Sequence, residues 1–223
     1  MKAYFITATD TDAGKTFIST QLLSYWRAQG YKTLGFKPVA SGCQQTKQGL
    51  RNDDAVQIQA ASNVSLAYET INPYAFVPAI APHIAAEQAG VHINLTTITQ
   101  AILPYQNQVD RLLVEGVGGW AVPLNQTESV AELAKALGFP VILLVKLQLG
   151  CINQALLSAQ AILHSGVKIA GWIANNCHKN TVMQSQDETI LAIQQRLEAP
   201  LLGVIPYVSE QDNFLISDYI DLE

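Results

Sequence analysis

Residues 9–16 read Thr9-Asp10-Thr11-Asp12-Ala13-Gly14-Lys15-Thr16 and carry the strongest structural signal in this chain of 223 residues. A P-loop consists of Gly, four residues and then Gly-Lys-Ser/Thr. Its backbone N–H groups cradle phosphates, its lysine reaches the β- and γ-phosphates, and its hydroxyl binds Mg²⁺. Thr9 stands where this pattern has its first glycine, but Gly14-Lys15-Thr16 is intact. Since an apolar run precedes the segment and a helical pattern follows it, these residues predict a nucleotide phosphate site.

The alternation of apolar runs and helical patterns continues along the whole chain. Uninterrupted apolar runs are typical of strands that are buried on both faces of a parallel sheet. The sequence therefore predicts an α/β fold, with an open, mostly parallel sheet, helices on both faces and the P-loop NTPase type of architecture, in one domain over residues 1–223. The predicted strands are Ala3–Ala8, Thr33–Val39, Arg111–Glu115, Val141–Leu147, Ile169–Asn175 and Leu201–Ile205.

Helical patterns lie between these runs. Ile18, Leu22 and Trp26 recur at a spacing of four residues, and Gly30 is a stop signal for that helix. Another helix is expected to begin near Gly150. Each predicted helix therefore returns the chain to the start of a further parallel strand.

Two stretches show no strand or helix pattern. Ala40 to Asn52 is polar with two glycines, and we expect it to be the longest irregular segment and a functional or mobile loop. Pro206 to Glu223 is rich in acidic residues. We expect this last stretch to be a solvated tail or a cover.

Composition and charge exclude several classes of protein. The chain has 13 Lys and Arg against 18 Asp and Glu, a net charge of −5, which argues against unspecific binding to nucleic acid or to an acidic membrane. No apolar run approaches the ~20 residues that span a bilayer, and Asp10 comes too early for a secretory signal. Cys43, Cys151 and Cys177 lack Cys-x-x-Cys spacing and predict reduced thiols. We expect a soluble, cytoplasmic protein.

A metal ion bound to phosphate needs a carboxylate from a second strand end. Glu115 follows an apolar strand, and the glycine-rich run Gly116–Gly119 behind it lets the backbone approach a phosphate closely. Glu115 is therefore the predicted Mg²⁺ ligand. Asp53 and Asp54 open a helical stretch, where carboxylates could simply cap the helix or complement its dipole.

The residues after a late strand indicate which nucleotide base the site binds. A GTPase is expected to carry Asn-Lys-x-Asp there, but this chain has Asn175-Asn176-Cys177-His178. An asparagine amide can pair with the amino group and ring nitrogen of adenine. The sequence therefore favours ATP.

Further motifs are spread over essentially the whole chain. They read Lys37-Pro38-Val39-Ala40-Ser41-Gly42, Arg51-Asn52-Asp53-Asp54, Asn72-Pro73-Tyr74, Pro82-His83, Glu115-Gly116-Val117-Gly118-Gly119, Leu149-Gly150-Cys151-Ile152-Asn153 and Gly203-Val204-Ile205-Pro206. Together with residues 9–16, they resemble the dethiobiotin synthetases of the biotin pathway in order and spacing. Ala8, Asp12 and Gln148 depart from that family's common residues, which are Gly, Glu and Lys.

The resemblance implies a role for each matched position. Thr11, Lys15 and Lys37 would be catalytic, and Thr16, Asp54 and Glu115 would bind Mg²⁺, which selects Asp54 over Asp53. Ser41, Leu149, Gly150, Cys151, Ile152 and Asn153 would bind the substrate. The implied ATP site consists of Asp12, Ala13, Gly14, Lys15, Thr16, Phe17, Asp54, Glu115, Gly116, Val117, Gly118, Asn175, Asn176, Pro206, Tyr207 and Val208.

The resemblance also implies the reaction and the assembly. An enzyme of this family takes 7,8-diaminononanoate, CO₂ (or bicarbonate) and ATP, with Mg²⁺, to dethiobiotin, ADP and phosphate, through a carbamate and a carbamic-phosphoric anhydride. Gly150–Asn153 would bind the substrate carboxylate across the interface of a homodimer. No nucleic acid and no membrane partner is implied.

The predicted topology supports the same site. In open α/β sheets, ligands bind outside the carboxyl ends of the strands, and the six candidate segments each follow a different strand. Two alternatives remain. A related cobyrinate-amidating synthetase would carry a glutaminase domain, for which this chain is too short. A partitioning or septum-positioning ATPase commonly has a second lysine early in the loop, where this chain has Thr11 and Asp12.

Overall fold

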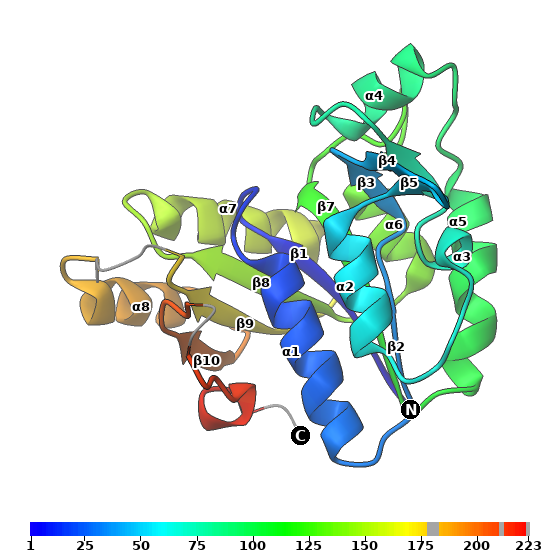
Figure 1. Cartoon of the computed structure of the whole chain (residues 1–223). Coiled ribbons are helices and arrows are strands. Elements are labelled where there is room, and N and C mark those ends of the chain that lie inside the picture. The colour runs from blue at the N-terminus through cyan, green and yellow to red at the C-terminus, as the bar shows by residue number, and fades with distance from the viewer. Residues whose placement is uncertain (178–182, 210–211, 222–223) are drawn as a thin grey trace.

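A six-stranded parallel sheet forms the centre of the computed structural model, which describes residues 1–177, 183–209 and 212–221 (Figure 1). Each strand pairs in parallel with its neighbours, in the order β10-β9-β8-β1-β7-β2. The strands are β1 (Lys2–Ala8), β2 (Thr33–Phe36), β7 (Arg111–Gly119), β8 (Val141–Lys146), β9 (Ile169–Asn175) and β10 (Leu201–Ile205). Each of the six predicted strands is present and the parallel arrangement is confirmed, although the second strand is shorter than predicted.

Side chains that alternate along β1 build a separate core on each face of the sheet, because successive residues of a strand point to opposite faces. Tyr4, Ile6 and Ala8 pack with α1 and α2, while Ala3 and Phe5 pack with the helices behind. Figure 1 shows α1 and α2 together in front of the sheet. The front helices are α1 (Lys15–Ala28) and α2 (Asp53–Ala61); the other core includes α5 (Leu95–Ile102), α6 (Val130–Leu137), α7 (Cys151–His164) and α8 (Gln186–Gln194).

Helix α1 follows from its sequence pattern. Ile18, Leu22 and Trp26 form its buried stripe, and each is at most 1% exposed. Gly14 precedes the helix with φ 84°, and Gly30 follows it with φ 86°. Both backbone conformations are left-handed and favour glycine, so the two predicted ends of the helix are confirmed.

The predicted strand Thr33–Val39 is wrong in its second half. Strand β2 ends at Phe36, opposite Val114 of β7, and Pro38 has no N–H with which to continue the pairing. The chain leaves the sheet there and forms β3 (Val39–Ser41), which pairs with β6 (Tyr74–Phe76). This break places Lys37 at the carboxyl edge of the sheet.

The expectation of a long irregular loop at Ala40–Asn52 is also wrong. The segment contains the end of β3 and an antiparallel hairpin of β4 (Gln44–Thr46) and β5 (Gly49–Arg51). Gly49, with φ 101°, closes the turn. The hairpin has no buried side chain, so it lacks the apolar alternation by which strands are recognised.

The last segment is a cover over α1 rather than a solvated tail, within its described residues 206–209 and 212–221. Ile216 and Ile220 are buried in the front core, and the Phe214 ring centroid lies 5.3 Å from that of Phe17. The remaining short helices are α3 (Tyr68–Ile71), α4 (Pro82–Gln88), η1 (Leu103–Asn107) and η2 (Ile216–Asp218). In the described part of the chain, no helix combines the length and apolarity required to cross a membrane.

Helix α6 begins with a capping box that makes its stability depend on pH. Glu132 accepts hydrogen bonds from the Ser129 backbone N–H (2.7 Å) and from the Ser129 hydroxyl (2.6 Å), while Ala131 N–H donates to Ser129 Oγ. These bonds, first of all the one from the Ser129 hydroxyl, lower the pKa of Glu132 from its ordinary 4.5.

We expect Glu132→Gln to lower the free energy of unfolding at pH 7 by about 0.5–1 kcal/mol, since the box is exposed to solvent. The folded pKa is depressed, so this contribution is present above the unfolded pKa and is lost as the pH falls through the folded value. Urea unfolding at pH 7 and at more acidic pH checks it, with the exposed Glu198→Gln as control. A difference that persists at acidic pH would contradict the assignment.

Candidate functional site

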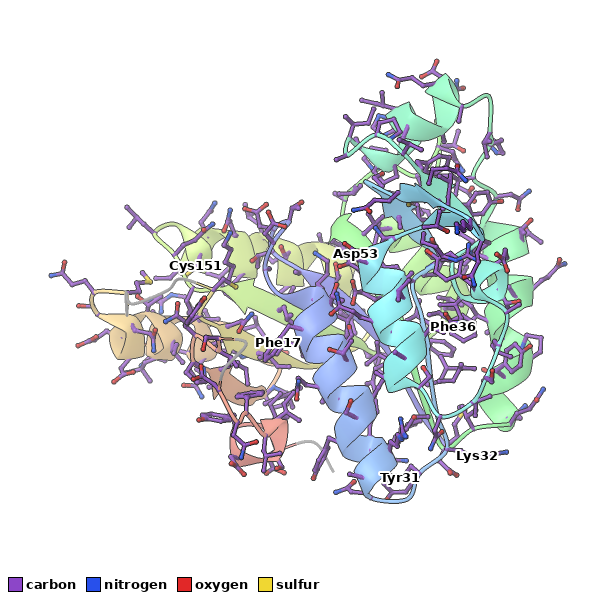
Figure 2. The ribbon with its side chains drawn as sticks, viewed as in Figure 1. Phe17, Tyr31, Lys32, Phe36, Asp53 and Cys151 are labelled. Atoms are coloured by element: carbon purple, nitrogen blue, oxygen red, sulfur yellow. The ribbon has the colours of Figure 1, made fainter. Side chains whose placement is uncertain are left out.

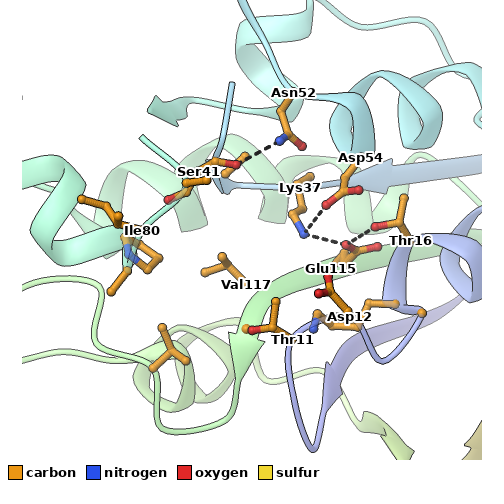
Figure 3. Close-up of a pocket in the computed structure, with 18 of the residues that line it drawn as sticks. Thr11, Asp12, Thr16, Lys37, Ser41, Asn52, Asp54, Ile80, Glu115 and Val117 are labelled. Carbon is orange, nitrogen blue, oxygen red and sulfur yellow. Dashed lines mark hydrogen bonds and ion pairs between the residues drawn. The ribbon is translucent and has the colours of Figure 1, made fainter. Parts of the chain in front are cut away.

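A cavity of about 830 Å³ lies at the carboxyl edge of the sheet, where β1, β2 and β7 end (Figure 3). It brings together the loop before α1, the break after β2, the start of α2 and the middle of β7. The predicted residues that line it are Thr11, Asp12, Gly14, Lys15, Thr16, Phe17, Lys37, Ser41, Asp54, Glu115, Val117 and Gly118. The expectation that these separate strand ends meet at one edge is borne out for this group.

Lys37 lies between two carboxylates. Its Nζ is 2.6 Å from Glu115 Oε1 and 3.3 Å from Asp54 Oδ2, and it also donates to the Gly116 carbonyl (3.2 Å). The other bonds to Glu115 come from α1: Thr16 Oγ1 donates to Oε1 (2.9 Å) and Ser19 Oγ to Oε2 (2.7 Å). Glu115 is fully buried, and both of its carboxylate oxygens accept hydrogen bonds from protein groups, as a buried charge requires.

The two cavity lysines have opposite pKa shifts. Burial lowers the pKa of Lys15 to about 8, and the nearby Lys37 ammonium adds to this effect. Burial also opposes the charge on Lys37, but the ion pairs with Glu115 and Asp54 together outweigh it and raise the pKa of Lys37. Lys37 is therefore a fixed cation, whereas Lys15 loses its proton more readily than an ordinary lysine.

The residues around Lys37 fit a nucleotide-bound Mg²⁺. Mg²⁺ is usually held by one or two carboxylates together with phosphate oxygens, rather than by an all-protein cage. Thr16, Asp54 and Glu115 supply one hydroxyl and two carboxylates; both carboxylates pair with the Lys37 ammonium, and the hydroxyl donates to Glu115. Among the described residues, no cluster of three or more His, Cys, Asp and Glu exists that would suggest a different metal site.

The loop before α1 is held from behind by β9. Asn175 Nδ2 donates to the Ala13 carbonyl (2.8 Å), and a Cβ on Gly14 would lie 2.3 Å from the same Nδ2 atom. Only glycine therefore fits at position 14, where φ is 84°. Asp12 also has positive φ (55°), an uncommon conformation that clusters at ligand-binding loops. Asp10 Oδ1 braces the loop by accepting from Thr11 N–H (2.7 Å).

The other residues predicted for ATP do not line this cavity. Asn175 is 4% exposed, and its Nδ2 donates to the Ala13 carbonyl, so in this conformation its amide braces the loop before α1. Asn176 N–H donates to the Ile205 carbonyl, which joins the ends of β9 and β10. The residues outside the cavity are Ala13, Gly116, Asn175, Asn176, Pro206, Tyr207 and Val208. His178, quoted beside them, lies outside the described residues.

The predicted substrate residues at the start of α7 lie apart from the cavity. Leu149 is 96% exposed, Cys151 is fully buried, and none of residues 149–153 lines the cavity. Figure 2 shows Cys151 well separated from Asp53, the first residue of α2. Gly150 is the N-cap of α7 with φ 94°, so the first N–H groups of a 14-residue helix follow it, as predicted. Within one chain, this group does not meet Ser41.

The structure adds residues that the sequence did not single out. Ser19 lies three residues after Thr16 and shares its face of α1, which is the signal that could have revealed it. Asn52 caps α2 with its side chain and lines the cavity; an Asn before a helical stretch is a recognisable N-cap. Residues 79–81 also line the cavity without a sequence signal of their own, next to Pro82 of the motif Pro82-His83.

Comparisons with known proteins give one consistent result. The family model described as AAA domain matches residues 2–213. The ATP-dependent dethiobiotin synthetase BioD of Cellvibrio japonicus (strain Ueda107) is 47% identical over 221 residues, 99% of this chain and 96% of that protein. The BioD of Pseudomonas aeruginosa (strain UCBPP-PA14) is 46% identical over 223 residues, 100% and 97% of the two chains.

Solved structures agree on the fold. The MinD cell division protein of Aquifex aeolicus matches with a TM-score of 0.59 at 14% identity, covering 98% of this chain and 85% of that chain. At this identity the similarity shows the fold alone, and it confirms the predicted P-loop NTPase type. The septum-positioning alternative therefore shares the architecture, whereas the full-length sequence relatives are synthetases.

Proposed function

The chain belongs to the family of ATP-dependent dethiobiotin synthetases, and from that premise we propose that phosphoryl transfer takes place around Lys37 in the cavity at the sheet edge. The observation that carries the proposal is the cluster of Lys37, Glu115, Asp54 and Thr16 beside the P-loop. It combines the cation, the carboxylates and the hydroxyl that ATP chemistry requires. ATP, CO₂ and 7,8-diaminononanoate are the proposed substrates.

The proposed reaction has three bond-forming steps. One amine of the diamine adds to CO₂, loses a proton and becomes a carbamate anion. A carbamate oxygen then attacks the γ-phosphorus, and the bond to ADP breaks. The second amine attacks the carbonyl carbon of this mixed anhydride, and phosphate leaves with the bridging oxygen, which closes the ureido ring.

The residues of the cavity act by position and charge. Lys15 is 8% exposed, and its Nζ donates to the Asp10 carbonyl (3.2 Å); in this proposal it pairs with a β- or γ-phosphate when ATP binds. Lys37 is placed to neutralise the transferred phosphoryl group, and Thr11 lines the same wall. Mg²⁺, held by Thr16, Asp54 and Glu115, would neutralise the phosphate oxygens. Because a carbamate is already an anion, no strong protein base is needed.

We further propose that the active assembly is a homodimer with the substrate shared between protomers. Ser41 lies in the cavity, but Gly150–Asn153 do not, so in this proposal the start of α7 comes from a second copy. Free N–H groups at a helix start suit a substrate carboxylate. Leu149, at 96% exposed, and the exposed Val77, Ile80 and Ile84 near the cavity supply apolar surface for such an interface.

A mixture of two damaged protomers tests the shared site. Asn153→Asp adds a negative charge where the carboxylate would bind, yet suits the first turn of a helix. Coexpressed with Lys37→Gln, it should restore about a quarter of wild-type activity at low diamine concentration, since half of the dimers are mixed and one of their two sites is intact. Each variant alone is the control. No recovery in isolated mixed dimers would contradict a shared site.

Oxygen labelling tests the chemistry itself. With C¹⁸O₂, freshly added and sampled before its oxygen exchanges with water, the released phosphate should carry one ¹⁸O atom from the carbamate. Mass spectrometry of phosphate and product measures this directly. Dethiobiotin formed alongside unlabelled phosphate would exclude the carbamic-phosphoric anhydride.

We propose that the 223 residues act as one domain in the cytoplasm, without nucleic acid or membrane partners. Two observations support this. The free cysteines Cys43, Cys151 and Cys177 suit a reducing compartment, and the net charge is −5.

A further inference from the structure

A chain of buried hydrogen bonds runs from α3 to the cavity. The Tyr68 hydroxyl accepts from Asn52 N–H (2.8 Å) and donates to Asn72 Oδ1 (2.9 Å). Asn72 Nδ2 then donates to the Lys37 carbonyl (2.6 Å). The four residues are between 3% and 7% exposed, so water does not compete for these bonds. The catalytic and metal-binding roles described so far do not account for these hydrogen bonds, which together we call the relay.

These bonds replace what Lys37 loses at the break between β2 and β3. Outside the sheet, its carbonyl accepts from Asn72, and its N–H donates to the Ile71 carbonyl (3.1 Å). Tyr74 N–H in turn donates to the Pro38 carbonyl (3.1 Å). The backbone of Lys37 is therefore fixed by residues 71 and 72, and not by a neighbouring strand of the main sheet.

The same hydrogen bonds also reach the start of α2, which carries Asp54, the second carboxylate beside the Lys37 ammonium. Asn52 Oδ1 accepts from Ala55 N–H (3.2 Å) and caps α2, two residues before Asp54. Asn52 Nδ2 donates to the Ser41 carbonyl (3.2 Å), as Figure 3 shows. Tyr68 thus connects the backbone that carries Lys37 to the helix start that carries Asp54.

Arg51 limits the freedom of the Tyr68 ring. Its guanidinium carbon lies 4.1 Å from the ring centroid, and its Nη2 atom is 3.1 Å from Glu69 Oε1. A stacked ring whose hydroxyl has both a donor and an acceptor has little choice of position. The relay consequently keeps the Lys37 backbone and the start of α2 at a constant separation, and does not adapt to a ligand.

We propose that Tyr68 and Asn72 are positioning residues, which set the separation of the Lys37 ammonium from the Asp54 carboxylate in the phosphoryl-transfer site. The inference rests on the proposed function of that site. It assigns a purpose to the Asn72 side chain of the motif Asn72-Pro73-Tyr74, which the nucleotide and metal sites leave unexplained.

Tyr68→Phe removes one hydroxyl and keeps the stacked ring. We expect kcat to fall about tenfold or more, because the phosphoryl-transfer geometry loosens, while the KM for MgATP stays within about twofold. Tyr74→Phe is a matched control: the Tyr74 hydroxyl also accepts from the backbone N–H of an Asn N-cap, Asn94 (3.0 Å), but this bond lies outside the relay. It should lose thermal stability with kcat within about twofold of wild type.

Asn72→Ala cuts the relay one residue closer to Lys37, and it decides the question if Tyr68→Phe folds poorly. The double variant should have a kcat no lower than that of the worse single variant, because both changes break one connection. Unchanged kcat in the folded variant, or equal kcat losses in Tyr68→Phe and Tyr74→Phe, would overturn the inference. An active Lys37→Gln in the same assay would instead overturn the proposed role of Lys37.

Discussion

Lys37→Gln should lower kcat by about 10²–10⁴-fold and leave the KM for MgATP within a few-fold. Lys37 is 4% exposed, and its ammonium is held between Glu115 and Asp54 at the cavity wall. Removal of a fixed cation costs most in the transition state, where negative charge spreads over the transferred phosphoryl group. Steady-state kinetics with saturating diamine and bicarbonate measures the split between kcat and KM.

Two accompanying results separate this role from a merely structural one. Lys32→Gln, at an exposed lysine whose Nζ donates to the Gln108 carbonyl (3.4 Å), should leave kcat unchanged. The apparent affinity for Mg²⁺ should rise in Lys37→Gln, because the ammonium no longer pairs with Glu115 and Asp54. A kcat within tenfold of wild type would contradict the assigned role.

Glu115→Gln is the second change with a large expected effect. The substitution keeps the shape of the side chain but removes the negative charge to which Lys37, Thr16 and Ser19 donate hydrogen bonds. We expect the Mg²⁺ concentration for half-maximal activity to rise about 10–100-fold, and the free energy of unfolding to fall by about 3–5 kcal/mol as Lys37 loses its closest partner.

Magnesium titration of turnover and urea unfolding in parallel check both effects. Glu198→Gln, at an exposed position after α8, controls for the loss of one carboxylate elsewhere. An unchanged Mg²⁺ requirement would remove Glu115 from the metal site, whatever the change in stability.

The sequence predicted the sheet and the centre of the site because both depend on local patterns. Apolar runs mark the six strands, and Gly14-Lys15-Thr16 marks the loop between β1 and α1. The positions of Lys37 and Glu115 then follow from the rule that parallel strands end at one edge. The Cα register confirms this, since β2 pairs in parallel with β7 from Thr33 opposite Arg111 to Phe36 opposite Val114, directly before Lys37 and Glu115.

The elements that the sequence missed depend on partners distant in the chain. Pro38 is a local signal for the end of the strand at Phe36, but the pairing of Val39–Ser41 with residues 74–76 has no local signal. The strands of the hairpin at 44–51 bury no side chain and contain one apolar residue, Leu50, so they show no apolar alternation. Tyr68 is the clearest case, because the two hydrogen-bond partners of its hydroxyl are Asn52, 16 residues before it, and Asn72. No sequence pattern connects the three residues.

The most direct measurement is the incorporation of labelled bicarbonate carbon into acid-stable product with MgATP, with and without 7,8-diaminononanoate. We predict that label is fixed only when the diamine is present, with one ADP formed for each carbon, and that Lys37→Gln lowers both rates by at least about 100-fold. ATP hydrolysis that ignores the diamine and fixes no carbon would contradict the account. It would leave an ATPase with the same fold and a different substrate.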